Sequence, residues 1–186
     1  IMRRKLYEDA PFPIPYISKH IPANGKPTVN KIYNEFINFV DDVFTIDKKW
    51  TLKFAEIYAR DCGIPFTINA RFDHFDEDIV AALAKANLSM VYAGIESGNE
   101  YMRNVVMERA QSLEDIYGTA ELFRKYNIRV LTENVLGGPG ETFDMAMETL
   151  IVNTKVKPVV ANASIFAPYP GMKMTQISLI ITGKVM

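Results

Sequence analysis

The chain has 186 residues, a formal net charge of −1, a hydrophobic fraction of 48% and a charged fraction of 23%, which are values typical of one globular domain with a real core. The small net charge argues against nucleic acid or an anionic membrane as a partner, no apolar run is long enough to span a bilayer, and no signal peptide is recognisable. The only cysteine, Cys62, excludes an internal disulfide framework and a metal site made of cysteines alone, so we expect a reducing, cytoplasmic location.

The chain begins with a proline-rich segment, residues 1–28, that contains five prolines and Gly25. Prolines at this density interrupt both helices and central strands, so we expect an irregular lead-in here. A short helical stretch is predicted for residues 29–34.

Five apolar runs follow, and each has the length and composition of a buried strand. They cover residues 36–40, 66–70, 89–95, 128–136 and 159–166. Apolar residues at helical spacing lie between them. They predict helices that begin near Asp47, Asp76, Ser112 and Phe143, and a short helix over residues 99–106. Residues 173–186 are apolar without a clear period, and we treat them as a C-terminal tail.

Alternating strands and helices predict an α/β fold with a parallel sheet and right-handed crossovers. In such folds ligands bind where the strands end. The unusual residues of this chain lie at those positions: Asp41 and Asp42, Asn69 with Arg71 and Asp73, Glu96 and Ser97, Gly137–Gly140, and Pro168–Gly171. We therefore predict one binding mouth, centred on the stretch 91–98 in which an apolar strand ends at Glu96.

The same motifs make the chain resemble the radical SAM superfamily, in particular the branch that includes magnesium-protoporphyrin ester cyclases and often carries a cobalamin-binding domain upstream. The motifs are Phe39-Val40-Asp41-Asp42-Val43-Phe44-Thr45, Ala70-Arg71-Phe72-Asp73, Gly94-Ile95-Glu96-Ser97-Gly98, Glu108-Arg109, Gly137-Gly138-Pro139-Gly140-Glu141-Thr142 and Pro168-Tyr169-Pro170-Gly171. They follow the family's order at about its spacing. The resemblance covers roughly residues 36–172.

The resemblance implies a partial parallel (β/α) barrel over residues 29–172 that holds S-adenosylmethionine across the strand ends. It also implies a [4Fe-4S] cluster, a small-molecule substrate and possible use of cobalamin. By the resemblance, the cofactor-binding residues are Asp41, Asp42, Arg71, Glu96, Ser97, Arg109, Gly138 and Gly140. The acidic pair matches the family's contact with the methionine ammonium, Arg109 its contact with the carboxylate, and Arg71 and Glu96 its contacts with the ribose and methionine portions.

One departure from the family concerns the cluster. The family ligates it with three cysteines in a C-x3-C-x2-C loop, which this chain lacks, and Cys62 matches none of the three. About five of six strand–helix units are recognisable. We therefore assign no catalytic residue and no metal ligand, and the chain reads as a fragment, an internally deleted member or a degenerate relative.

Several alternatives stay open at this level. Asp41 and Asp42 could cap a helix, Glu96 could be a structural partner of Arg71 or Arg109, Arg109 could be a solvated surface charge, and Gly137–Gly140 could be a plain turn. In function, the rivals are a non-catalytic S-adenosylmethionine-binding module and an unrelated barrel-like hydrolase or isomerase that uses Glu96, Asp41 and Asp42 for acid–base catalysis. An unpaired edge at residues 36–40 would favour self-association.

Overall fold

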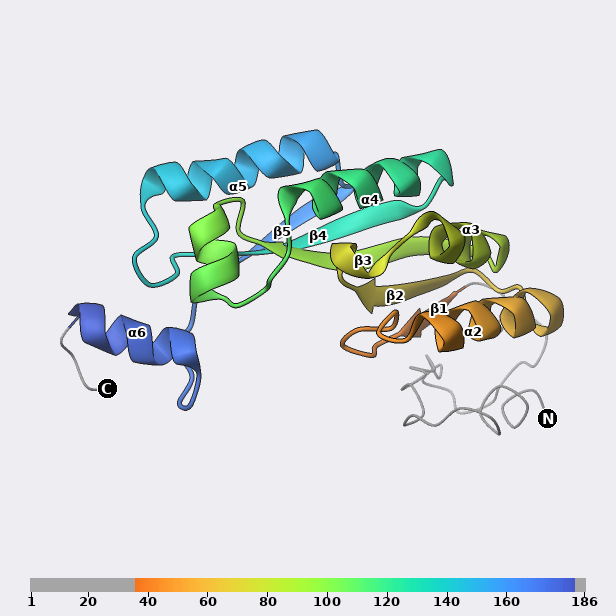
Figure 1. The fold of residues 1–186 in the computed structure, drawn as a ribbon, viewed down its shortest axis with the longest axis horizontal. Helices are drawn as coiled ribbons and strands as arrows, with labels where there is room; N and C mark the ends of the chain where they lie inside the picture. The colour runs from red at the N-terminus through yellow and green to blue at the C-terminus, as the bar shows by residue number, and fades with distance from the viewer. Residues whose placement is uncertain (1–35, 183–186) are drawn as a thin grey trace, which may run out of the picture.

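The computed structural model describes residues 36–182, which form an α/β fold around one parallel sheet (Figure 1). The sheet has five strands in the order β1-β2-β3-β4-β5, and every neighbouring pair is parallel. The strands are β1 (Ile37–Phe39), β2 (Phe66–Ala70), β3 (Leu88–Glu96), β4 (Arg129–Leu136) and β5 (Val160–Ile165). Because the strands are parallel, all five carboxyl ends lie at one edge. Within residues 36–182 the sheet does not close, so the predicted partial barrel is confirmed.

Helices connect the strands, as predicted. They are α2 (Lys48–Asp61), α3 (Glu77–Lys85), α4 (Leu113–Lys125) and α5 (Phe143–Val156), with a 3-10 turn η1 (Phe72–His74) after β2. All five predicted strands are present, and no predicted strand boundary differs from the observed one by more than one residue. No helix of the described part of the chain is long and apolar enough to cross a membrane.

Two segments differ from the prediction. The short helix expected over residues 99–106 is largely a π-helical turn, η2 (Met102–Val106), in which the Met107 N–H donates to the Met102 carbonyl at 2.9 Å. The tail expected after residue 172 contains a helix, α6 (Lys173–Thr182), whose apolar residues gave no period in the sequence. The helix predicted for residues 29–34 lies outside the described residues.

Side-chain caps fix where four helices begin. Asp47, Asp76, Ser112 and Thr142 each accept a hydrogen bond from the backbone N–H three residues later, which satisfies a donor that the helix cannot satisfy itself. Ser112 and Asp115 form the predicted capping box. Since Asp47 caps α2, the interpretation of Asp41 and Asp42 as its capping pair is wrong.

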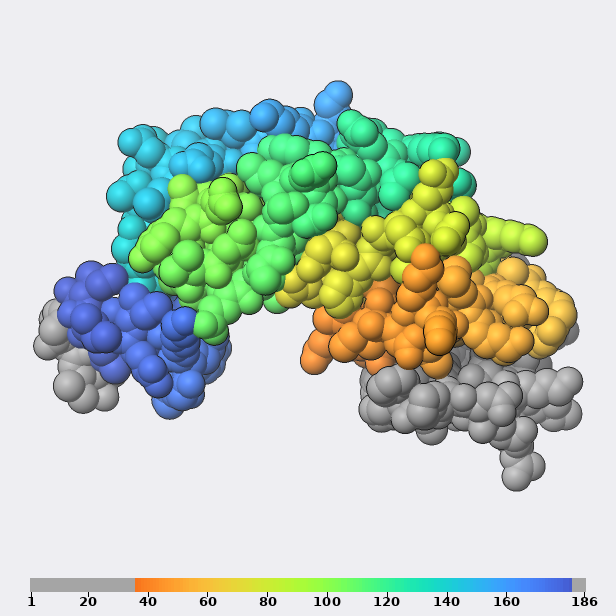
Figure 2. Space-filling view, viewed as in Figure 1, coloured from red at the N-terminus to blue at the C-terminus, as the bar shows by residue number. Residues whose placement is uncertain are grey.

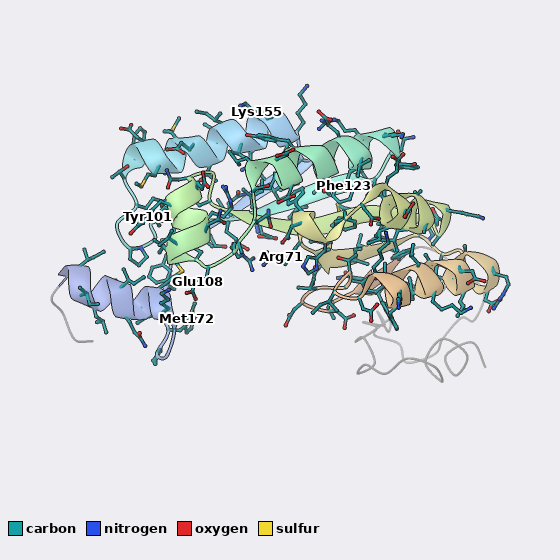
Figure 3. All side chains as sticks on the ribbon, in the orientation of Figure 1. Arg71, Tyr101, Glu108, Phe123, Lys155 and Met172 are labelled. Atoms are coloured by element: carbon teal, nitrogen blue, oxygen red, sulfur yellow. The ribbon has the colours of Figure 1, made fainter. Side chains whose placement is uncertain are left out.

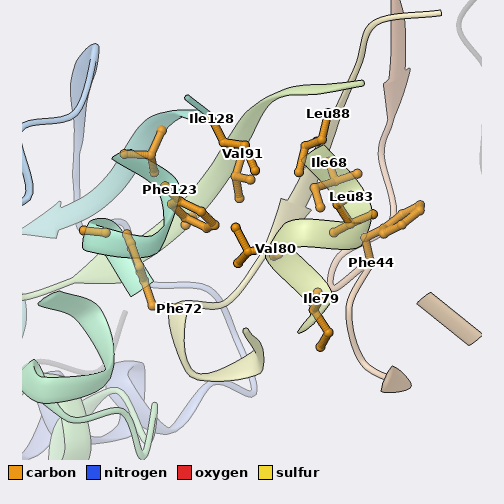
Figure 4. Packing of buried hydrophobic residues seen from close by; sticks show 14 of the residues in the cluster. Phe44, Ile68, Phe72, Ile79, Val80, Leu83, Leu88, Val91, Phe123 and Ile128 are labelled. Carbon is orange, nitrogen blue, oxygen red and sulfur yellow. The ribbon is translucent and has the colours of Figure 1, made fainter. Parts of the chain in front are cut away.

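The hydrophobic core lies between the sheet and helices α2–α5, as the close view in Figure 4 shows for Phe72, Val80, Val91 and Phe123. Around β1 and β2 the core is aromatic, and Phe66 packs edge-on against Phe39 with ring centroids 5.6 Å apart. Burial of this apolar surface is the main source of stability.

The two faces of the sheet differ in character. On the face that the helices cover, Ile68, Val91 and Val130 are buried. The neighbouring positions point to the opposite face, because side chains alternate along a strand. There Tyr92 and Glu133 are only partly buried. In a barrel this second face is the interior, and it leads to the edge at which the strands end.

Candidate functional site

Glu96 ends β3 in an unusual backbone conformation. Its φ is 65°, and the Ser97 N–H donates to the Ile95 carbonyl at 2.8 Å, which closes a tight γ-turn around it. The register between β3 and β4 also shifts between Gly94 and Glu96, as at a β-bulge. Bulges re-aim side chains at the ends of strands. The backbone therefore turns the Glu96 carboxylate away from the direction that a regular strand would give it.

Glu96 forms an ion pair with Arg109, which follows η2. The side chains of Glu96 and Arg109 are 15% and 36% exposed, so the pair is partly shielded from water. Burial, and then the positive charge of Arg71, lower the pKa of Arg109, although an arginine stays protonated. The structure thus supports the alternative in which Glu96 pairs with an arginine, and the interpretation of Arg109 as a solvated surface charge is wrong.

The pair occupies the space above Gly94. A Cβ atom at Gly94 would lie 2.2 Å from Glu96 Oε1 and 2.8 Å from Arg109 Nη2. Real Cβ atoms do not come this close to other atoms, so residue 94 has to be a glycine if the two charged side chains are to meet there. The glycine of the Gly-Ile-Glu-Ser-Gly motif thereby has a steric explanation.

Arg71, which directly follows β2, also contacts the pair. Its guanidinium forms two parallel hydrogen bonds with Asp73, of 2.9 and 2.8 Å, and also donates to the Arg109 carbonyl. Burial raises the pKa of Asp73, but the hydrogen bonds and charge of Arg71 outweigh it, so this pKa lies below its usual range. Three of the predicted site residues, Arg71, Glu96 and Arg109, are therefore brought together by the fold (Figure 3 labels Arg71).

Backbone strain concentrates around this cluster. Six non-glycine residues in the described part of the chain have a positive φ. Asn87, Asn127 and Lys157 lie within two residues of a helix C-terminus, where this conformation is common. The other three are Glu96, Glu108 and Ala110, with φ of 65°, 53° and 50°. These residues flank or form the ion pair. Such strain persists only where the surroundings enforce it, and it gathers at functional sites.

The acidic pair after β1 lies beside the end of β2, since the Phe44 N–H donates to the Asn69 carbonyl at 2.9 Å. Asp41 Oδ2 is buried and has no hydrogen-bond partner among residues 36–182. Burial raises the pKa of Asp41, a backbone hydrogen bond partly offsets this, and Asp42 adds to the rise. Asp42 itself is exposed. A buried carboxylate oxygen without a donor is suited to a ligand ammonium group.

The remaining predicted residues support the backbone of the site. Ser97 is fully buried, and its hydroxyl oxygen accepts from the Asn99 N–H at 3.2 Å, so this side chain is used in the turn. Gly138 is buried, and a Cβ there would lie 2.8 Å from Met102 Cε and 3.5 Å from Met174 Cε. Gly140 needs its glycine for a φ of 81°. Residues 137–140 therefore form a turn whose shape depends on its glycines, as in the alternative interpretation of this segment as a plain turn.

Helix α6 borders the site. Lys173 forms an ion pair with Glu108, next to Arg109, and Figure 3 shows Glu108 close to the start of α6. Figure 2 shows the molecule hollowed between α6 and the segment from β1 to α2. The strand ends that carry the charged residues therefore lie beside an open concave surface, with α6 as one wall.

Arg103 was not predicted as part of the site. It lies in η2 and is 1% exposed, and it donates to three backbone carbonyls near Glu96 and Arg109. In the sequence, Arg103 is a charged residue among the apolar residues Met102, Val105 and Val106. This pattern equally fits an arginine on the exposed face of a helix, so it did not indicate a buried position.

The side chains of residues 36–182 do not fit an iron–sulfur cluster. Among residues 36–182 no group of three or more His, Cys, Asp or Glu side chains could hold a metal ion. Cys62 is the C-cap residue of α2, just before β2 begins, and so lies at the opposite edge of the sheet from the strand ends. The prediction that Cys62 is no cluster ligand agrees with this position.

Comparison with known proteins gives the family. The family model of the Radical SAM superfamily matches residues 27–151, which is more than half of the chain. The chain belongs to the radical SAM superfamily. Members of this superfamily use S-adenosylmethionine and a [4Fe-4S] cluster, as predicted from the motifs. The predicted resemblance to this superfamily is thereby confirmed.

Two curated proteins are similar in sequence over most of this chain. An uncharacterised methyltransferase of Pyrococcus horikoshii is 25% identical over 144 residues, which is 77% of this chain and 31% of that protein. A tRNA-2-methylthio-N(6)-dimethylallyladenosine synthase of Sulfurihydrogenibium is 25% identical over 170 residues, or 89% of this chain and 35% of that protein. The chain thus spans about a third of the length of these relatives.

Solved structures share the fold. The radical S-adenosylmethionine methyltransferase TsrM of Kitasatospora setae, solved with tryptophan and an S-adenosylmethionine analogue, superposes with a TM-score of 0.68 at 18% identity, over 77% of this chain and 29% of that one. The coproporphyrinogen III oxidase HemN of Escherichia coli, a radical SAM enzyme, gives 0.65 at 14% identity, over 79% and 35%. These likenesses support the partial barrel.

Proposed function

We propose that this chain is the part of a radical SAM enzyme that binds S-adenosylmethionine, and that the ligand lies at the strand ends beside Glu96 and Arg109. The observation that carries the proposal is the cluster of Arg71, Glu96 and Arg109, which come from different elements and meet on strained backbone. A stabilising core does not need a charged cluster on strained residues, whereas a ligand site does.

Each residue has a chemical role in this proposal. Arg109 offers a planar fork to the methionine carboxylate, and Arg71 keeps the backbone of Arg109 in place through its hydrogen bond to the carbonyl. Asp41, with its unpartnered oxygen, accepts from the methionine ammonium group, and Asp42 adds negative charge nearby. When the carboxylate of the ligand binds Arg109 in place of Glu96, the Glu96 carboxylate accepts hydrogen bonds from the ribose hydroxyls. Glycines 138 and 140 let the backbone approach the adenine.

The chain's own residues bind and orient the ligand, and they exclude water from one side of it. S-adenosylmethionine supplies the group that is transferred or the source of radical chemistry. The chain has a single cysteine, and residues 36–182 contain no group of side chains that could hold a cluster, so its residues act on S-adenosylmethionine alone. For the whole enzyme we propose radical modification or methylation of a small organic molecule, in line with the methyltransferase among its relatives, and possible use of cobalamin.

Calorimetric titration with S-adenosylmethionine tests this proposal. Saturable binding is expected, and Glu96→Ala and Arg109→Ala should each weaken it about 10- to 100-fold, the usual cost of losing a hydrogen bond to a charged group. Lys125→Ala is a matched control, because Lys125 forms an ion pair with Glu77 that is remote from the mouth. Absence of binding by the folded wild-type protein, or equal weakening in the Lys125 variant, would contradict the proposal.

A second candidate is a non-catalytic module that binds S-adenosylmethionine without cleaving it. The missing cluster ligands favour this function. Reconstitution of the chain with iron and sulfide under anaerobic conditions distinguishes the two. A chain that acquires the visible absorption of a cluster and then consumes S-adenosylmethionine would exclude the module. The third interpretation, acid–base catalysis by Glu96, is less well supported because Glu96 is paired with Arg109.

Other expectations stay predictions. These are the boundaries after residues 28 and 172, a cytoplasmic location, the absence of nucleic-acid partners, and self-association through residues 36–40. In the described sheet both β1 and β5 are edge strands, so two edges are available for self-association. Sedimentation equilibrium with a charged substitution on each edge in turn would show which edge, if either, forms a dimer.

A further inference from the structure

Arg103 is the largest of the fully buried side chains and carries a positive charge. Its Nε donates to the Gln111 carbonyl at 2.7 Å, and its Nη1 donates to the carbonyls of Ser97 and Gly98 at 2.9 and 3.1 Å. Within residues 36–182 no carboxylate forms an ion pair with it. Burial lowers the pKa of Arg103, but a guanidinium stays protonated in proteins. A buried cation is costly, and these carbonyls, together with the negative charges of Glu100 and Glu148, compensate for its lost hydration.

The three carbonyls belong to the two strained segments of the site. Ser97 and Gly98 directly follow Glu96, and Gln111 directly follows Ala110. In addition, the Arg109 N–H donates to the Arg103 carbonyl at 3.0 Å. One residue thus contacts, by its side chain and its backbone, the loops that carry both partners of the ion pair.

The shape of the side chain suits this bridge. A guanidinium has donors that diverge in a fixed plane, so it can hold two segments of backbone at a set separation. A lysine has a single flexible ammonium group and cannot fix that separation. Arg103 lies in the π-helical turn of η2, and such turns occur frequently at functional sites.

We infer that Arg103 is a positioning residue for ligand binding, one that holds the Glu96 loop and the Arg109 loop at the separation at which both side chains reach a ligand. This inference rests on the proposed function. The strained conformations of Glu96, Glu108 and Ala110 need contacts that enforce them, and the hydrogen bonds of Arg103 supply such contacts on both sides. Arg103 acts through Glu96 and Arg109 and does not touch the ligand.

The test compares Arg103→Lys and Arg103→Met with Val80→Ala, a cavity variant in α3 that is remote from the mouth. For each protein the affinity for S-adenosylmethionine, the melting temperature and the amide hydrogen exchange are measured. Both Arg103 variants should bind about 10- to 100-fold more weakly than wild type, since the displaced loops no longer present Glu96 and Arg109 to the ligand in the right geometry. Val80→Ala should lower the melting temperature and leave the affinity of the folded protein unchanged.

Hydrogen exchange separates positioning from general stability. In the Arg103 variants the amides of Ser97 and Arg109 should exchange faster, while those of α3 keep their protection. Wild-type affinity in a folded Arg103→Met protein would overturn the inference. The inference would also fail if Val80→Ala weakened the affinity for S-adenosylmethionine as much as the Arg103 variants do at the same loss of stability. If wild type itself does not bind S-adenosylmethionine, the proposed function fails separately. In that case unchanged exchange at Ser97 and Arg109 would overturn the inference, and locally faster exchange would leave Arg103 as the residue that positions the two loops.

Discussion

The core under the helices and the mouth at the strand ends are built in opposite ways. In the core, apolar side chains pack in unstrained elements whose ends are capped, as at Asp47 and Ser112. In the mouth, Glu96, Glu108 and Ala110 have strained backbone, and charged groups lie partly buried. Both regions are formed by the same sheet, one on a face and the other at an edge.

The difference indicates where the free energy of unfolding comes from and where part of it is lost. Burial of apolar surface stabilises the fold, whereas strain and charge desolvation at the mouth reduce the net stability. Substitutions in the two regions should therefore have different, and in one case opposite, effects on stability and binding.

The largest expected effect is in the core. Phe66 is fully buried among aromatic rings, so Phe66→Ala should lower the free energy of unfolding by about 3–5 kcal/mol. Urea denaturation measures this loss. Phe143→Ala is the control, since Phe143 is 78% exposed and its truncation should change stability by no more than about 0.5 kcal/mol. If the folded fraction of Phe66→Ala bound S-adenosylmethionine more weakly than wild type, the core and the mouth would not be energetically independent.

At the mouth, relief of strain should stabilise the protein. Ala110 has a φ of 50°, which glycine adopts without steric cost, so Ala110→Gly should raise the free energy of unfolding by about 1 kcal/mol. The same change at Ala120, inside α4, should lower it by about 1 kcal/mol, since glycine is a poor helix former. Thermal denaturation of both variants gives the signs. Destabilisation by Ala110→Gly would mean that the strain at this residue is not significant.

The smallest expected effect depends on pH. The pKa of Asp73 is lowered in the folded state, so its pair with Arg71 stabilises the protein above the unfolded pKa of about 3.9, and this contribution is lost as the pH falls through the folded pKa. Because the pair is partly exposed, Asp73→Asn should cost no more than about 1 kcal/mol at neutral pH.

Asp41 should behave in the opposite way. Its pKa is raised in the folded state, so its ionisation destabilises the protein as the pH rises through that value, and Asp41→Asn should stabilise the protein at neutral pH. Unfolding curves for both variants across the acid range check the two signs. Parallel curves for wild type and Asp73→Asn would contradict the assignment of the pair.

Much of the fold could be predicted from the sequence, because strands and helices leave local signals. The apolar runs placed every strand, and Asp47, Asp76 and Ser112 located the start of three helices. Helix α6 could not be predicted, since its residues have no clear amphipathic period. The π-helical turn of η2 was likewise missed, because a single widened turn leaves the same pattern of apolar residues as a short α-helix.

The site was only partly predictable. The sequence indicated that Arg71, Glu96 and Arg109 share an edge, because parallel strands end together. It left open which charges pair, since pairing depends on the turn at Glu96 and on the positive φ of Glu108 and Ala110, conformations that these residue types do not signal. The burial of Arg103 is a property of the tertiary structure, and no local pattern distinguishes it from an exposed helical arginine.

The contact at Gly98 has a consequence for motion. A Cβ atom there would lie 2.3 Å from the Glu148 carbonyl oxygen, and the Gly98 N–H donates to the Thr149 hydroxyl at 2.8 Å. The loop after Glu96 therefore rests directly on the backbone of α5 with no side chain between them. A displacement of α5 along its axis would therefore also displace Glu96. The charged mouth and this outer helix should move as a single rigid body.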